Sequence, residues 1–194
     1  MLRRGGRLEV KVLTRNEGKL REFIELGSEY GIEVVEVGLP KKEIQAETLE
    51  EVALYSAANA SPLVKGLFFA EDAGLFIDAL KGFPGVYSAY VLKTIGVSGI
   101  LKLMEGVQMR DAFFKSVIAL RVPREGIKIF RGEVKGRISF EARGSGGFGF
   151  DPIFIPEGEI RTFAEMSVRE KNMFSHRAAA FRAMADWLRT TFKP

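Results

Sequence analysis

The first 37 residues switch between two hydrophobic periods, and this pattern limits the possible folds more than any other feature of the chain. Residues 8–13 (LEVKVL) and 32–37 (IEVVEV) alternate apolar and polar side chains, which is typical of strands. Between them, four residues share one helical face: Leu20, Phe23, Ile24 and Gly27. Asn16 can cap this helix and Gly31 can end it. The pattern predicts a β-α-β unit.

The following segments extend this unit into a mixed α/β fold. Residues 48–51 (TLEE) form a capping box that opens a helix. Residues 66–70 (GLFFA) are a short apolar run, typical of a buried central strand, which we expect to stop at Glu71. Residues 111–122 and 126–140 have the pattern of two long strands, and the letters PREG that join them predict a hairpin.

Turn residues and helical periodicity recur in the rest of the chain. We expect a turn-rich loop at 82–88, a short helix at 96–106 and a final helix from near Ser175 to Phe192. One face of the final helix is apolar: Phe181, Met184, Ala185, Leu188 and Phe192.

Composition excludes several classes of protein. The chain has 194 residues, 46% hydrophobic and 28% charged, which suits a globular domain and excludes a disordered one. The lack of cysteine excludes disulfides and thiolate sites and favours a reducing interior, and a single histidine excludes a multi-histidine zinc site. The net charge of +4 suits an anionic substrate, nucleic acid or a merely solvated surface. We expect no signal peptide, because no apolar run of about 7–15 residues follows the basic start, and no membrane span, because no apolar run approaches about 18 residues.

The turn at 14–19 (TRNEGK) directly follows the first predicted strand. A strand-to-helix turn presents free backbone N–H groups and the positive end of the helix dipole. Thr14 and Asn16 add side-chain donors, and Lys19 adds a positive charge. The pattern of a Walker loop is absent. The segment is therefore either a phosphate cradle or an ordinary capped turn with a solvated lysine.

Two acids, Glu71 and Asp72, follow the predicted central strand, at the kind of place where open α/β sheets bind ligands. Carboxylates suit Mg²⁺, which binds one or two of them together with phosphate oxygens and water. Either Glu43 or Glu47, in the loop before the capped helix, can complete such a site with Asp72. The alternatives are a polar strand end and a solvated run of charges.

Residues 144–154 (GSGGFGFDPIF) combine four glycines with large apolar side chains. Glycines allow the backbone to approach a flat ligand, on which Phe148 or Phe150 can stack. Asp151 is then a fixed polar neighbour of the ligand, and Pro152 helps to lock the loop into the next strand. The alternative is a tight turn with phenylalanines in the core.

Three potential cations gather where the final helix begins. Ser175 can cap this helix, which puts His176 and Arg177 in its first turn, with Lys171 just before it. Cations here oppose the helix dipole at a cost of about 0.3–1 kcal/mol, which a bound anion or acceptor-rich ligand would offset. The alternative is a packed histidine beside surface cations.

In this order and spacing, the segments resemble the inosine triphosphate pyrophosphatase family, also called the Ham1 or non-canonical purine NTP pyrophosphatase family. The matching motifs are T-x-N-x-x-K at 14–19, E-D-x-G-L at 71–75, FPGVYSAY at 83–90, GGFGFDPIF at 146–154 and EKNxxSHR at 170–177. The resemblance spans nearly the whole chain and implies one pyrophosphatase domain, residues 1–194. It implies an elongated mixed sheet flanked by helices, in two lobes with the active-site cleft between them.

The resemblance also implies an activity: a cytoplasmic, Mg²⁺-dependent homodimer would hydrolyse ITP, dITP and XTP to the monophosphate and pyrophosphate and so cleanse the nucleotide pool. The catalytic acid is Asp72, and the metal ligands are Glu43 and Asp72. The substrate-binding residues are Thr14, Asn16 and Lys19 for the phosphates, Phe148, Gly149, Phe150 and Asp151 for the base and sugar, and Lys171, His176 and Arg177 for the purine and its phosphates.

The chain departs from the family pattern at four places. Two lysines intervene between Pro40 and Glu43. Ala73 stands at a substrate-contacting position that is usually Ser or Thr, and Phe150 replaces a common Tyr or Trp. The helix after residue 48 usually offers the phosphates a lysine, but residues 53–58 read ALYSAA, with Tyr55 or Ser56 nearby. Phosphate binding is therefore expected to depend more on Lys19 and the end of the first helix.

Two rival functions differ from this one in chemistry. A Maf-like pyrophosphatase of similar fold would prefer pyrimidine or modified nucleotides. A nucleic-acid-binding module would use a basic surface and exposed aromatics, but the charges here are mixed rather than clustered. We therefore expect neither a nucleic-acid nor a membrane partner.

Overall fold

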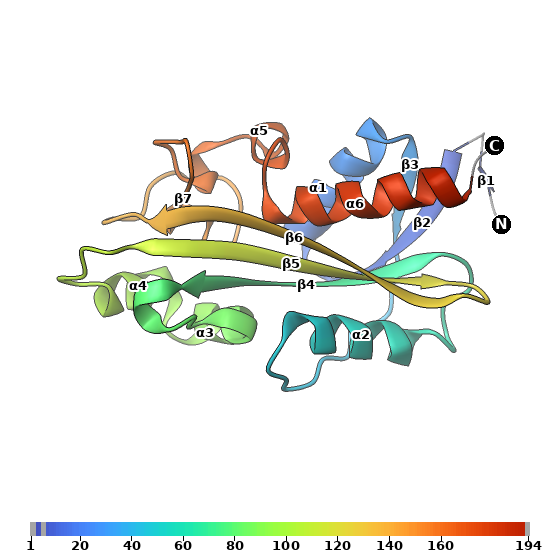
Figure 1. Ribbon diagram of the computed structural model, residues 1–194, viewed down its shortest axis with the longest axis horizontal. Helices are drawn as coiled ribbons and strands as arrows, with labels where there is room; N and C mark the ends of the chain where they lie inside the picture. The colour runs from blue at the N-terminus through green and yellow to red at the C-terminus, as the bar shows by residue number, and fades with distance from the viewer. Residues whose placement is uncertain (1–2, 5–6, 193–194) are drawn as a thin grey trace.

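A computed structural model, which describes residues 3–4 and 7–192, has a seven-stranded mixed sheet at its centre (Figure 1). The strands are β1 (Arg3–Arg4), β2 (Arg7–Leu13), β3 (Ile32–Glu36), β4 (Phe68–Ile77), β5 (Asp111–Val122), β6 (Gly126–Ile138) and β7 (Phe154–Pro156). Their order is β1-β2-β4-β5-β6-β7, with β3 also paired to β2. The pairs β2–β3 and β2–β4 are parallel, and β4 to β7 are antiparallel. Because β4, β5 and β6 are long, the sheet is elongated, as predicted.

Helices cover both faces of this sheet (Figure 1). They are α1 (Glu17–Glu29), α2 (Leu49–Ala60), α3 (Ser88–Thr94), α4 (Gly96–Leu103), α5 (Val168–Asn172) and α6 (His176–Thr191). Helices α1, α5 and α6 lie on one side, and α2, α3 and α4 lie on the other. Short 3₁₀ turns connect the elements at Asp78–Leu80, Gly85–Tyr87, Asp151–Ile153 and Phe163–Glu165.

Adjacent residues of β4 build the cores on the two faces, because successive side chains of a strand point to opposite sides. The ring of Phe69 packs against Phe23 of α1 and Phe181 of α6, with ring centroids 4.9 and 6.4 Å away. The ring of Phe68 is buried on the other face, in the apolar cluster that includes Ala53 of α2. The apolar run at 66–70 therefore contributes a strand buried on both faces, as the sequence predicts.

The predicted local signals are confirmed. Asn16 caps α1, since its Oδ1 accepts a hydrogen bond from the Lys19 amide at 3.0 Å. Thr48 and Glu51 form the reciprocal capping box of α2. The two long strands pair as a hairpin, and Ser175 caps the final helix.

The predicted end of the central strand is wrong. Strand β4 continues through Ile77, and its residues from Glu71 onward pair with β5. The two acids therefore lie inside a strand, which is possible because neighbouring groups neutralise them. Helices α3 and α5 are also absent from the sequence prediction. Helix α3 has no side-chain cap, so the sequence has no capping signal for it. Helix α5 has a capping box, Ser167 with Glu170, which is visible in the sequence.

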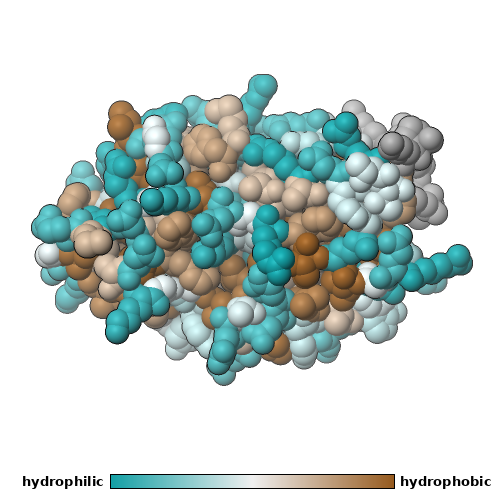
Figure 2. Space-filling model, in the orientation of Figure 1, coloured by the Kyte–Doolittle hydropathy of each residue, from teal (hydrophilic) through white to brown (hydrophobic). Residues whose placement is uncertain are grey.

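The surface is mostly hydrophilic, with apolar residues in patches between polar side chains on the face seen in Figure 2. Within residues 3–4 and 7–192, no helix has the length and apolar character needed to span a bilayer.

Candidate active site

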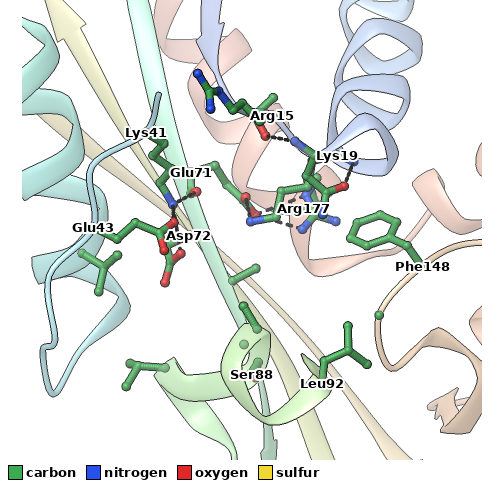
Figure 3. A pocket seen from close by; sticks show the side chains of 18 of the residues that line it. Arg15, Lys19, Lys41, Glu43, Glu71, Asp72, Ser88, Leu92, Phe148 and Arg177 are labelled. Atoms are coloured by element: carbon green, nitrogen blue, oxygen red, sulfur yellow. Dashed lines mark hydrogen bonds and ion pairs between the residues drawn. The ribbon is translucent and has the colours of Figure 1, made fainter. Parts of the chain in front are cut away.

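The candidate site exists because β2 is shorter than its neighbour. Strand β2 pairs with β4 only as far as Ala70, so the edge of β4 from Glu71 to Gly74 is left to face a pocket of about 420 Å³ (Figure 3). This pocket lies between the part of the molecule built on α1, α2 and α6 and the far end of the sheet with α3 and α4. The predicted cleft between two lobes is therefore present.

Most of the predicted site residues line this pocket: Thr14, Asn16, Lys19, Glu43, Asp72, Ala73, Phe148, Gly149, Phe150, His176 and Arg177. They come from segments far apart in the sequence, which shows that the five motifs meet in space. Two predicted substrate residues, Asp151 and Lys171, do not line it.

The two acids of β4 point in opposite directions and have different partners (Figure 3). Glu71 faces the α1 and α6 side, where its Oε2 lies 2.7 Å from Lys19 Nζ and its Oε1 lies 3.1 Å from Arg177 Nη2. Ser116 of β5 also donates a hydrogen bond to Oε1 at 2.7 Å. Burial alone would raise the pKa of Glu71, but the two cations outweigh burial and hold this pKa well below its usual range.

Asp72 faces the other side, toward the loop that follows β3. Lys41 Nζ lies 3.1 Å from Asp72 Oδ1 and 2.7 Å from Glu43 Oε1, and it donates a hydrogen bond to the carbonyl of Glu71 at 2.9 Å. Burial raises the pKa of Asp72 more than Lys41 and Lys19 lower it. A carboxylate in this state is a better proton acceptor than an exposed aspartate.

A buried ion network supports the pocket from beneath. Glu22 of α1 contacts both Lys171 Nζ (2.8 Å, from Oε1) and Arg177 Nη1 (2.6 Å, from Oε2). Lys171 Nζ also lies 2.6 Å from Asp151 Oδ2. These four side chains are at most 3% exposed. Lys171 and Asp151 therefore fix the loop and helices around the site, and unlike the other predicted site residues they do not line the pocket.

The glycines of the loop at 144–154 accommodate the chain itself rather than a flat ligand. Gly147 has φ +66°, and a Cβ there would lie 2.2 Å from Asp151 Oδ2. That oxygen accepts a hydrogen bond from the Phe148 amide at 2.8 Å, which closes the turn. Gly149, with φ +68°, lines the pocket. The expected clearance for a purine is therefore limited to Gly149.

Of the two candidate stacking rings, Phe148 is the available one. It is half-buried and packs across the start of α1, where Gly18 leaves room for it. Lys171 Nζ and Arg177 Cζ lie 4.9 and 5.3 Å from its ring centroid. Phe150 is only 3% exposed and belongs to the apolar core at the far end of the sheet, so it forms the pocket wall.

His176 is not the cation that the sequence suggested. Its ring stacks on Phe114 with centroids 4.7 Å apart, and its Nδ1 is buried without a hydrogen-bond partner in the described part of the chain. Burial, together with the charges of Arg177 and Lys171, moves the pKa of His176 well below its usual value. The imidazole is therefore neutral, and His176 lines the pocket.

The structure also shows where three further groups of residues lie relative to the pocket. Glu47 lies outside it, and its amide bonds to Glu51, so of the two candidate acids only Glu43 joins Asp72. Tyr55 and Ser56 also lie outside it, and the Ser56 hydroxyl donates to the carbonyl of Lys42. Neither residue therefore takes the place, within this pocket, of the lysine that the family's helix usually offers. Lys41 is the residue that the sequence analysis missed, although the two extra lysines after Pro40 were its signal.

The Glu43–Asp72 pair fits a divalent cation. The two carboxylates and the Glu71 carbonyl already converge on one positive charge, the Lys41 ammonium. No group of three or more acid or histidine side chains that could hold a metal occurs within the described residues. Mg²⁺ is commonly bound by one or two carboxylates with phosphate oxygens and water, so two are sufficient beside a triphosphate.

Comparisons with known proteins show which family this chain resembles. The model of the Ham1 family matches residues 10–187. A protein of Thermococcus kodakarensis named dITP/XTP pyrophosphatase is 54% identical over 186 residues, which is 96% of this chain and all of that protein. One of the same name from Saccharolobus solfataricus is 48% identical and covers 97% of this chain and 96% of its own length.

Solved structures show the same fold. The Ham1 protein of Staphylococcus aureus superposes with a TM-score of 0.80 at 28% identity, over 94% of this chain and 99% of that one. A HAM1 protein of Coxiella burnetii has a TM-score of 0.80 at 32% identity, over 93% and 98%. The fold, the converging motifs and these similarities lead to one conclusion: the chain belongs to the Ham1 family.

Proposed function

We propose that this protein hydrolyses non-canonical purine nucleoside triphosphates, such as dITP, XTP and ITP, to the monophosphate and pyrophosphate. The observation that carries the proposal is the convergence in one pocket of a helix N-terminus with Lys19, an acid pair, Glu43 and Asp72, and an aromatic end with Phe148. These are the groups needed for a triphosphate, its metal and its base. The relatives named dITP/XTP pyrophosphatase support the same activity.

The triphosphate would lie between the start of α1 and the edge of β4. The α1 N-terminus and Lys19 offer positive charge to the phosphates, and Arg177 supports that end from below. Asp72 accepts the proton of a water that attacks the α-phosphorus in line, and pyrophosphate leaves. Glu43 and Asp72 would hold Mg²⁺, which supplies charge neutralisation for the phosphates when bound.

The base would lie between Phe148 and His176. Hypoxanthine and xanthine present an acceptor at O6, where adenine presents an amine. A neutral His176 can donate a hydrogen bond to O6 from the ring nitrogen that carries its proton. Adenine would place its amine against this donor, so ATP is a poor substrate.

Three finer points belong to the same proposal: Mg²⁺ as the cofactor, a homodimer as the assembly and the cytoplasm as the location. The homodimer has support in exposed apolar side chains near the pocket rim, such as Tyr87 and Tyr90, which are 47% and 68% exposed. The location has support in the substrate class and the cysteine-free composition.

The test is pyrophosphate release across a panel of nucleotides, with and without Mg²⁺. We expect kcat/KM for ITP, dITP and XTP to exceed the value for ATP by at least about tenfold, the order of one good hydrogen bond. Equal values for all purines would refute the selection model. A preference for dTTP or UTP would instead indicate the Maf-like activity.

A further inference from the structure

Lys41 lies at the point in the pocket where three oxygens of neighbouring residues converge. Its Nζ contacts Glu43 Oε1 at 2.7 Å, the Glu71 carbonyl at 2.9 Å and Asp72 Oδ1 at 3.1 Å (Figure 3). Its side chain is only 11% exposed. The next residue, Lys42, is exposed and lines a different hollow, so the two adjacent lysines have different environments.

The neighbouring charges show which anions need Lys41. Glu71 already has Lys19 and Arg177 as cationic partners, together with the hydroxyl of Ser116. Asp72 and Glu43 have Lys41 as their ion-pair partner in the described residues. A divalent cation that bound the same two carboxylates would use the oxygens that now face this ammonium, because Mg²⁺ takes its oxygens at about 2.0–2.1 Å. The ammonium and the metal therefore compete for these carboxylates.

A displaced Lys41 ammonium can contact the phosphates of a nucleotide in the same pocket. Helix α2 has Tyr55 and Ser56 in the region where the family usually offers the phosphates a lysine, and both lie outside the pocket. Lys41 lies on a loop, and a lysine side chain is long and has several rotatable bonds. It can therefore move from the carboxylates to a triphosphate without movement of a helix or strand.

We propose that Lys41 is a tethered cation that exchanges partners: it neutralises Glu43 and Asp72 in the free protein, competes with the divalent cation for them, and moves to the phosphates when a metal–nucleotide complex binds. This inference rests on the proposed function, because it requires that metal and nucleotide share the pocket. It predicts opposite effects of one substitution on two ligands. A merely structural role for Lys41 would weaken the binding of both.

The first measurement is Mn²⁺ binding to nucleotide-free protein, followed by the electron paramagnetic resonance signal of free Mn²⁺. Lys41→Gln keeps most of the side-chain length and removes the charge. We expect it to tighten Mn²⁺ binding about tenfold or more, the order of effect for a unit charge removed about 4 Å from a divalent ion. Lys42→Gln is the matched control and should leave the affinity unchanged. Unchanged or weaker Mn²⁺ binding by Lys41→Gln, or equal tightening by Lys42→Gln, would overturn the proposal.

The second measurement is the affinity for a non-hydrolysable ITP analogue with saturating Mn²⁺. We expect Lys41→Gln to weaken this binding about tenfold, since a charged contact to the phosphates is lost. Unchanged or tighter nucleotide binding would refute the exchange of partners. Circular dichroism checks the fold, and Lys41→Met provides a second neutral side chain if the glutamine variant does not fold.

The two proposals fail in different ways. Wild-type protein that releases no pyrophosphate from any purine triphosphate would refute the proposed function, even if Lys41→Gln tightens Mn²⁺ binding. Selective hydrolysis of ITP and XTP, together with equal Mn²⁺ affinities for wild type and Lys41→Gln, would refute only the role of Lys41.

Discussion

The carboxylate of Glu22 and the guanidinium of Arg177, which are 155 residues apart in the sequence, lie 2.6 Å apart, and each side chain is 2% exposed. This pair joins α1 to the first turn of α6 beneath the pocket. Arg177 is also the partner of Glu71, and Glu22 is also the partner of Lys171. The pair therefore couples the stability of the fold to the shape of the site.

Replacement of Glu22 should be strongly destabilising. Glu22→Gln leaves Arg177 and Lys171 buried with less negative charge, and breaking one side of a buried pair costs about 3–5 kcal/mol. Urea unfolding measures this change in the free energy of unfolding. Asp186→Asn is the control, because its pair with Arg189 is 67% exposed and should change stability by less than about 0.5 kcal/mol. Equal, small losses in both variants would show that the buried pair does not stabilise the fold.

Acid should weaken the fold through Glu22 and Glu71. The pKa of each is lower in the folded protein than the ordinary value of 4.5, because their cationic partners outweigh burial. A lowered folded-state pKa gives a stabilisation that is complete above the unfolded value and is lost as pH falls below it. The difference in stability between wild type and Glu71→Gln should therefore be largest near pH 7 and shrink below about pH 4.5. A difference that stays constant down to pH 3 would contradict this linkage.

Asp72→Asn should separate catalysis from folding. The substitution removes the proton acceptor and a metal ligand, so we expect kcat for ITP to fall about 10²–10⁴-fold. Because burial raises the pKa of Asp72 in the folded protein, its charge costs stability at neutral pH, and a neutral amide should leave the melting temperature nearly unchanged. Turnover close to that of wild type would remove Asp72 from its catalytic role.

Local signals made much of the fold predictable. Asn16 and Thr48 cap their helices through hydrogen bonds that depend only on neighbours three residues away. The hairpin of β5 and β6 has a short turn, and residues 67–70 are buried because they are apolar. In each case the physical cause lies within the segment that shows the pattern.

The length of β4, and which predicted residues line the pocket and which belong to the ion network, could not be predicted in this way. Both depend on residues that lie far apart in the sequence. Glu71 can remain inside a strand because Arg177, 106 residues later, neutralises it. Asp151 turns away from the pocket because Lys171 draws its carboxylate into the ion network. Lys41 interrupts the family motif, and only the fold shows that its ammonium reaches Asp72.

The position of α6 depends on the absence of a side chain at Gly132 of β6. A Cβ there would lie 2.0 Å from the carbonyl oxygen of His176 and 2.4 Å from the amide of Ala180. Gly132→Ala therefore must push the first turn of α6 away from the sheet, which we expect to cost about 1–3 kcal/mol in unfolding free energy. Since this turn carries His176 and Arg177, the KM for ITP should also rise. Gly38→Ala is the matched control, because a Cβ at Gly38 meets no atom within 4 Å and its φ is not positive. Urea unfolding and initial-rate kinetics on both variants measure these effects, and a Gly132→Ala protein as stable and as active as Gly38→Ala would show that α6 does not need this close approach.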